Sequence, residues 1–192
     1  MSSRAGVETF AEARSLVPDP AYEERRRRSI TELDELLSTN SIDEPIADLM
    51  RRFARIPCCF TIQSCCGHFV TAGGREETIM KSVLCLCAPD SVVRYRIAYV
   101  AFCVQNDPFG RSFLNDLRSV QNVGPDYIQF GSAGWFWDRC ANSYVLQVEP
   151  DRYVSEDSCE VSVSEAVHSE TIRDKFLSRL DEVIGRHIEL QD

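Results

Sequence analysis

The stretch PCCFTIQSCCGHF, residues 57–69, divides the chain into a helical first part and a strand-rich second part. Its side chains fit an alternation with period two, the pattern of a β-strand. One face would carry Cys59, Thr61, Gln63 and Cys65, and the other Cys58, Phe60, Ile62 and Ser64. We expect the strand to end at Gly67, where the chain would enter a turn that continues into AGG at residues 72–74.

Two helices are predicted before this strand. The first begins with Asp19 as N-cap and Pro20 at the first helical position, and the second has Ser41 or Asp43 as its cap and ends at Pro57. Later strands are predicted at 81–87, 95–105, 127–137, 143–150 and 159–164, and later helices at 106–120 and 169–188. This order predicts an α+β fold with a mixed β-sheet covered by helices, two of them N-terminal and one C-terminal.

Length and composition favour a single domain over residues 1–192, with 1–18 as a flexible or loosely packed extension. The apolar fraction of 44% is enough for a folded core. The longest apolar run, residues 97–104, is far too short to span a membrane, and the N-terminus lacks the apolar segment of a signal peptide. We therefore expect a cytoplasmic protein whose nine cysteines are mostly buried and reduced.

The net charge of the chain bears on which partners it binds. The net charge is −9, and residues 150–192 contribute most of it, with 5 basic and 11 acidic side chains. A nucleic-acid-binding protein is more often basic, so the overall charge disfavours RNA without excluding a local basic face. The predicted C-terminal helix carries a regular apolar stripe, for which homodimer formation is one use.

The cluster of cysteines with His68 has three interpretations. A structural zinc site needs ligand pairs two to four residues apart, whereas Cys59 and Cys65 share a face but lie six residues apart, so we assign no metal. A nucleophilic cysteine needs a base and a lowered pKa, for which a nearby histidine is weak evidence. The third interpretation is a backbone site, because a glycine after a strand lets a ligand approach main-chain N–H groups.

One segment resembles a known family. TNSIDEPIADLMRRFARIPCCFTIQSCCGHF, residues 39–69, is similar to the N-terminal core of the wybutosine-synthesis tRNA methyltransferases. In that family a helix with a Gly-Ser-Ile-Asp-like start leads into a strand that ends in Ser-Ser-Cys-Ser-Gly-Arg. The matching positions here are Ser41, Ile42 and Asp43, followed by Ser64, Cys65 and Gly67. The resemblance covers residues 25–69, including a preceding helix rich in basic residues.

The resemblance implies S-adenosylmethionine as cofactor and methylation of a modified guanosine in tRNA. The ligand site that we predict on this basis contains Asp43, Ser64, Cys65, Gly67 and His68. Three positions depart from the family motif, because Gln63 replaces a small hydroxylated residue, Cys66 replaces the serine before the glycine, and His68 replaces the arginine. The fixed positive charge of the arginine is thereby exchanged for a titratable ring.

An aromatic cluster in GSAGWFWDRC, residues 131–140, is a further candidate. In a strand, Trp135 and Trp137 would share one face and offer a stacking surface for a base or an adenine ring. The alternative is that both are part of the core, which aromatic side chains commonly fill. We include both in the predicted ligand site.

The leading hypothesis is methyl transfer from S-adenosylmethionine to an RNA or nucleotide substrate, and no catalytic residue is assigned. One alternative is a non-catalytic domain of the same fold that binds a small ligand or a protein. Another is a protein that responds to metal or redox state through its Cys/His cluster. Loss of S-adenosylmethionine binding on substitution of Ser64 or Gly67 would distinguish the first from the others.

Overall fold

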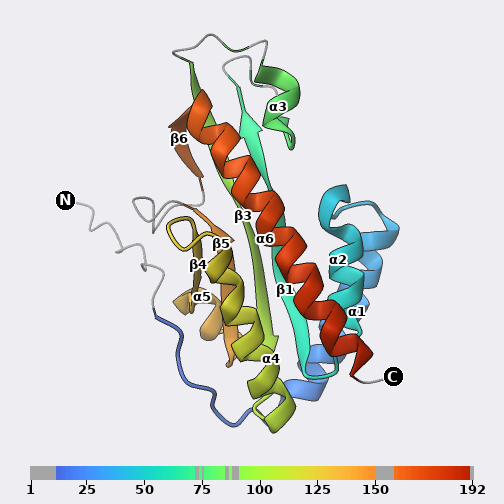
Figure 1. The fold of residues 1–192 in the computed structure, drawn as a ribbon. Helices are drawn as coiled ribbons and strands as arrows, with labels where there is room; N and C mark the ends of the chain where they lie inside the picture. Colours follow the sequence, from blue (N-terminus) through green and yellow to red (C-terminus); the bar gives the residue numbers. More distant parts are fainter. Residues whose placement is uncertain are drawn as a thin grey trace, which may run out of the picture.

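The computed structural model describes residues 12–71, 74, 76–84, 87, 91–149 and 158–190. The described chain begins with a pair of helices, continues with strands interrupted by helices, and ends in a long helix (Figure 1). The helices are α1 (Tyr22–Ser38), α2 (Glu44–Ala54), α3 (Met80–Val83), α4 (Pro108–Ser119), α5 (Gly134–Trp137) and α6 (Val163–Glu189), with a 3₁₀ turn, η2, at Val120–Val123. The strands are β1 (Cys59–Val70), β2 (Glu76–Glu77), β3 (Val92–Val104), β4 (Ile128–Gly131), β5 (Ser143–Val148) and β6 (Ser158–Ser162).

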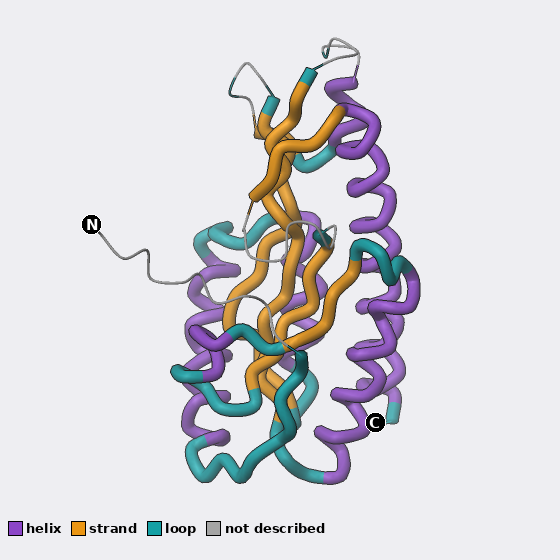
Figure 2. The backbone as a smooth tube through the Cα atoms, turned by 90° about the vertical axis from the view of Figure 1, so that its left-hand side faces the viewer, coloured by secondary structure: helices purple, strands orange, loops and turns teal. Residues whose placement is uncertain are grey.

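The described strands form one sheet in the order β2-β1-β3-β5-β4, with β6 also paired to β3. Every pairing among them is antiparallel. The long strands β1 and β3 run side by side from Cys59 opposite Val104 to Val70 opposite Arg94. Helices lie on both sides of the sheet (Figure 2), so the predicted α+β fold of a sheet covered by helices is confirmed.

Alternate side chains of β3 enter two different cores, because successive residues of a strand point to opposite faces. Val100, Phe102 and Val104 belong to the large core, which also includes side chains of α2, α4 and α6. Ala101 and Cys103 contact smaller clusters on the other face, which also contain Tyr22 of α1 and Phe136 of α5. Helix α6 crosses the sheet on the first face (Figure 1).

The apolar stripe of α6 is part of this large core. Phe176, Leu180, Val183 and Ile184 are all fully buried within the chain. The sequence argument for a homodimer used this stripe as a free surface, and that argument is wrong, since the protein's own sheet and helices cover it.

Strand β1 differs from the predicted strand in its length and regularity. It continues through Gly67 to Val70 instead of turning at the glycine, and its register shifts between Thr61 and Gln63. Gly67, within β1, has φ +83°, and an added Cβ would lie 3.0 Å from Ala98 Cβ on β3. The glycine therefore serves a left-handed kink inside the strand and close packing on β3.

Two predicted strands contain residues that are helical in the structure. Residues 81–83 of the predicted strand 81–87 lie in α3, and residues 85 and 86 are outside the described part. The predicted strand 127–137 ends at Gly131, and α5 follows at Gly134–Trp137. Helix α1 also begins later than expected, at Tyr22, although Asp19 still accepts a hydrogen bond from the Ala21 N–H at 3.2 Å.

The expected loose extension is anchored where the structure describes it. The amide of Asn142 accepts a hydrogen bond from Val17 N–H and donates one to the Val17 carbonyl, both at 2.8 Å. The Tyr144 hydroxyl donates to the Arg14 carbonyl at 2.9 Å. Residues 1–11 lie outside the described part of the chain. Within the described residues, no helix has both the length and the apolar composition needed to cross a membrane.

Candidate functional site

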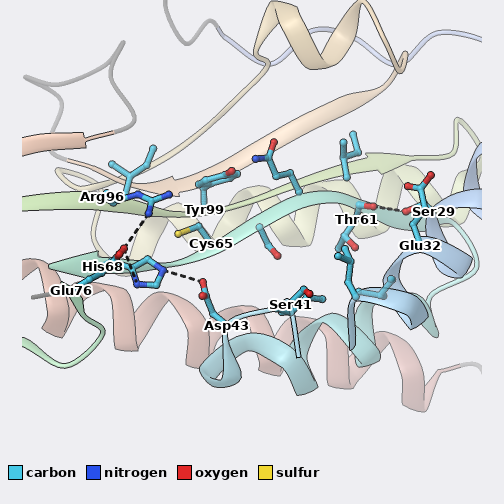
Figure 3. Close-up of a pocket in the computed structure, with 17 residues that line it drawn as sticks. Ser29, Glu32, Ser41, Asp43, Thr61, Cys65, His68, Glu76, Arg96 and Tyr99 are labelled. Carbon is cyan, nitrogen blue, oxygen red and sulfur yellow. Dashed lines mark hydrogen bonds and ion pairs between the residues drawn. The ribbon is translucent and has the colours of Figure 1, made fainter. Parts of the chain in front are cut away.

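A cavity of about 570 Å³ lies between α1, the α1–α2 connection and the sheet (Figure 3). Strand β1 contributes residues 61–65 and 68, and β3 contributes Arg96, Ile97 and Tyr99. Helix α1, the connection and β2 supply the remaining wall, including Glu32, Ser41, Asp43 and Glu76. Four of the predicted site residues, Asp43, Ser64, Cys65 and His68, therefore line one cavity.

Asp43 is the residue that connects α2 to β1 at this cavity. It is the N-cap residue of α2, but its carboxylate makes no cap hydrogen bond with its own helix. Instead, Oδ2 accepts a hydrogen bond from Cys66 N–H at 2.9 Å and lies 3.2 Å from His68 Nε2. Strand β2 pairs with β1 only at Phe69 and Val70, so Asp43 satisfies an N–H on the edge of β1 that β2 does not reach.

Burial alone would raise the pKa of Asp43. The hydrogen bond from Cys66 N–H and the adjacent His68 ring lower it by more, so the pKa of this carboxyl lies below its usual value. Asp43 is thus held as a carboxylate at the edge of the cavity.

His68 is held between two carboxylates. Its Nδ1 lies 3.5 Å from Glu76 Oε1, opposite the Nε2 that faces Asp43. The same Glu76 oxygen accepts a hydrogen bond from Arg96 Nη1 at 3.0 Å. Figure 3 shows this row of charged and ionisable groups running along one side of the cavity, from Asp43 through His68 and Glu76 to Arg96.

The two cysteines of this segment have different surroundings. Cys65 lines the cavity, and its Sγ accepts a hydrogen bond from Gly67 N–H at 3.4 Å. Cys66 is 1% exposed and lies on the core side. Burial raises the pKa of both thiols, and the charge of Asp43 raises that of Cys66 further. Neither thiol has the lowered pKa that a nucleophilic cysteine needs, so the nucleophile interpretation gains no support.

A metal-ligand set also lies beside the cavity. One ligand atom each from Asp43, Cys66 and His68 is within 4.8 Å of the others. The spacing of the cysteines led to no metal assignment from the sequence, and Asp43 was not considered as a metal ligand, because that residue lies 25 positions before His68. The sequence also predicted a site where a ligand approaches the backbone at Gly67. Gly67 does not line the cavity, and it packs against β3 instead.

The predicted aromatic surface is absent from this site. In α5, Trp135 and Trp137 do not share the face that a strand would give them, and neither lines the cavity. Trp135 is 47% exposed, whereas the Trp137 ring packs edge-on against Tyr144 with a centroid distance of 5.9 Å. The Arg14 guanidinium lies 5.3 Å from the centroid of the Trp137 ring.

No family model matches this chain, and no curated protein matches its sequence. Solved structures do match its fold. Two structures of the PH1069 protein from Pyrococcus horikoshii superpose with TM-scores of 0.57 and 0.55, at 14% and 13% identity. The alignments cover 86% and 88% of this chain and 95% and 96% of PH1069. At this identity the likeness shows a shared fold and carries no activity to this chain.

Proposed function

We propose that this protein binds S-adenosylmethionine in the cavity between α1 and the β1–β3 strands and transfers its methyl group to a nucleotide or RNA substrate. One observation carries the proposal. The two segments that resemble the wybutosine-synthesis methyltransferases, residues 41–43 and 64–68, are separated by twenty residues of sequence, and yet both contribute side chains to the same cavity, the second through Ser64, Cys65 and His68. Residues that only pack a core would have no reason to meet at an open, partly polar cavity.

The size and chemistry of the cavity support the proposal. Its volume of about 570 Å³ falls in the range of small-molecule sites, roughly 300–1,000 Å³. The Glu32 carboxylate suits the ribose hydroxyls or the amino group of the cofactor. Arg96 is the guanidinium that suits the cofactor's carboxylate, and Tyr99 offers an aromatic ring for the adenine.

In this reaction the main task of the protein is to position the acceptor against the methyl group. In methyl transfer the acceptor atom forms a bond to the methyl carbon as the bond from that carbon to sulfur breaks. The electron pair of the broken bond stays on sulfur, the neutral thioether leaves, and a proton on the acceptor passes to solvent. Holding the acceptor in line with the methyl group removes much of the entropic barrier. Backbone groups and side chains on β1 and β3 suit this task, because paired strands hold them rigidly.

The proposal is tested by calorimetric titration of the purified protein with S-adenosylmethionine. The Ser64→Leu variant places a bulky apolar side chain at the cavity wall. The matched control is Ser158→Leu, which changes another half-buried serine on β6, at the other edge of β3 and outside the cavity.

We expect micromolar-range binding by the natural protein and by Ser158→Leu, and at least about tenfold weaker binding by Ser64→Leu, about 1.4 kcal/mol. Absence of binding by the natural protein would refute the cofactor. Equal affinity of all three proteins would refute the location.

A further inference from the structure

We propose that Asp43, Cys66 and His68 bind a zinc ion whose fourth coordination position faces the cavity. This inference goes beyond the proposed function and does not depend on it, because it rests on the three side chains alone. Carboxylate oxygen, thiolate sulfur and imidazole nitrogen are all ordinary zinc ligands. The residues come from two segments that the fold brings together, the start of α2 and the middle of β1.

The distances are close to those of a tetrahedral site. With ordinary zinc bond lengths, the ligand atoms of such a site lie roughly 3.4–3.6 Å apart. Asp43 Oδ2 is 3.2 Å from His68 Nε2, and Cys66 Sγ is 4.0 Å from the same nitrogen. All three ligand atoms lie within 4.8 Å of one another, so small side-chain rotations that close gaps of up to about 1.4 Å are enough to form the site.

The groups around the ligands match those of known metal sites. A histidine that binds a metal through one ring nitrogen commonly donates the other N–H to a carboxylate, which fixes the tautomer and the orientation of the ring. Here His68 Nδ1 faces Glu76 at 3.5 Å, and Arg96 holds that carboxylate at 3.0 Å. The Asp43 carboxylate is likewise fixed by Cys66 N–H. This outer arrangement is the observation, independent of the ligand set itself, that points to a metal.

The Cys66 thiol is the proposed ligand on the side that faces the core. Cys66 is 1% exposed, and the guanidinium of Arg173 lies behind it, donating to the Gly67 carbonyl at 3.5 Å. A thiol that coordinates zinc is deprotonated by the ion itself, and its proton passes to solvent.

The site is of the open kind. Asp43 and His68 line the cavity while Cys66 does not, so the free position of the ion points into the cavity. Zinc with three protein ligands keeps its fourth place for water or for a ligand atom. The group that we expect there is an anionic or lone-pair donor of whatever occupies the cavity, such as a carboxylate, a phosphate oxygen or a ring nitrogen.

The test uses the full chain freed of metal with a chelator and titrated with zinc alone, and with cobalt as a spectroscopic probe. The informative variants are Cys66→Ser and His68→Arg, which restore the residue types of the resembling motif. The matched control is Cys65→Ser, which removes the adjacent thiol from the cavity wall but leaves all three proposed ligands. Circular dichroism and thermal unfolding establish whether each variant is folded. If Cys66→Ser or His68→Arg does not fold, Asp43→Asn is tested in its place.

We expect one zinc per chain and a thiolate-to-cobalt charge-transfer band in the natural protein and in Cys65→Ser. The Cys66→Ser variant should lose the band, and His68→Arg should bind zinc at least about tenfold more weakly. The inference is overturned by the absence of stoichiometric zinc, by a band that persists in Cys66→Ser, or by a band that is lost in Cys65→Ser. Failure to bind S-adenosylmethionine with zinc still bound would overturn the proposed function alone.

Discussion

Asp43 has two structural roles, one in its own helix and one in a neighbouring strand. It begins α2, and at the same time its side chain leaves the helix to bind the edge of β1 at Cys66 and His68. A carboxylate that accepts a backbone N–H makes one of the stronger hydrogen bonds in proteins. The residue therefore fixes the position of the α1–α2 connection against the strand, and with it one wall of the cavity.

Replacement of Asp43 by alanine should lower the free energy of unfolding by about 1–3 kcal/mol, because the Cys66 N–H loses its acceptor. Urea unfolding measures the change. The matched control is Asp48→Ala, on the same helix, where the carboxylate is 83% exposed. That change should stay within about 0.5 kcal/mol. Equal effects of the two substitutions would contradict the structural role assigned to Asp43.

The site could be predicted only in part from residues near one another in sequence. The motif segments identified Asp43, Ser64, Cys65 and His68, all of which line the cavity. Glu32, Glu76, Arg96 and Tyr99 were missed. They come from α1, β2 and β3, and their place at the cavity depends on how β1 pairs with its neighbours, which no local pattern specifies.

At the scale of the element, β1 is the strand on which both proposals depend. It carries Ser64 and Cys65 to the cavity and Cys66 towards the core, and the left-handed kink at Gly67 then returns His68 to the cavity. A regular strand would instead alternate strictly through this segment. The kink is what places the His68 ring beside Asp43.

Gly67→Ala should therefore be strongly destabilising. The new Cβ meets Ala98 at 3.0 Å, and φ +83° is costly for any residue other than glycine. We expect a loss of at least about 2 kcal/mol in urea unfolding. Gly74→Ala is the control, because it has φ +71° but no atom within 4 Å of the added Cβ. A loss at Gly67 no larger than at Gly74 would show that contact with β3 is unimportant.

Short elements account for most of the errors in the sequence-based prediction. The long helices and β3 have several turns or alternations of consistent pattern, and their types were predicted correctly. Residues 134–137, GWFW, have the aromatic composition of a strand, yet tertiary packing decides their conformation. Phe136 packs with Ala101 and Val145 from the sheet, and Trp137 with Tyr144, contacts that the sequence alone does not reveal.

On the scale of the whole molecule, the two faces of the sheet have different coverings. Helices α2, α4 and α6 pack over the large core on one face. On the other face the hydrophobic clusters are smaller, and the helices that contribute to them are α1 and α5. The cavity opens on this second side, where Tyr99 shares the face of Ala101 and Cys103. A fold of this kind keeps a rigid core behind an accessible site.

The segment before α1 should detach when its anchor is removed. Asn142 is buried with φ 62°, so Asn142→Gly keeps the backbone conformation and deletes only the amide that binds Val17. We expect a loss of about 1–3 kcal/mol and faster cleavage by trypsin after Arg14. Asn40→Gly, at an exposed residue with φ 50°, is the control and should leave both quantities nearly unchanged. An unaltered cleavage rate in Asn142→Gly would mean that this anchor is dispensable.

The central claim is that the cavity beside β1 is where this protein holds its ligand. Nuclear magnetic resonance of the ¹⁵N-labelled chain during titration with S-adenosylmethionine tests it most directly, since each backbone amide reports separately. We predict saturable shifts of the amides at 41–43 and 64–68, with those of Trp135 and Trp137 unchanged. Shifts centred on α5, or no shifts at saturating cofactor, would contradict the account.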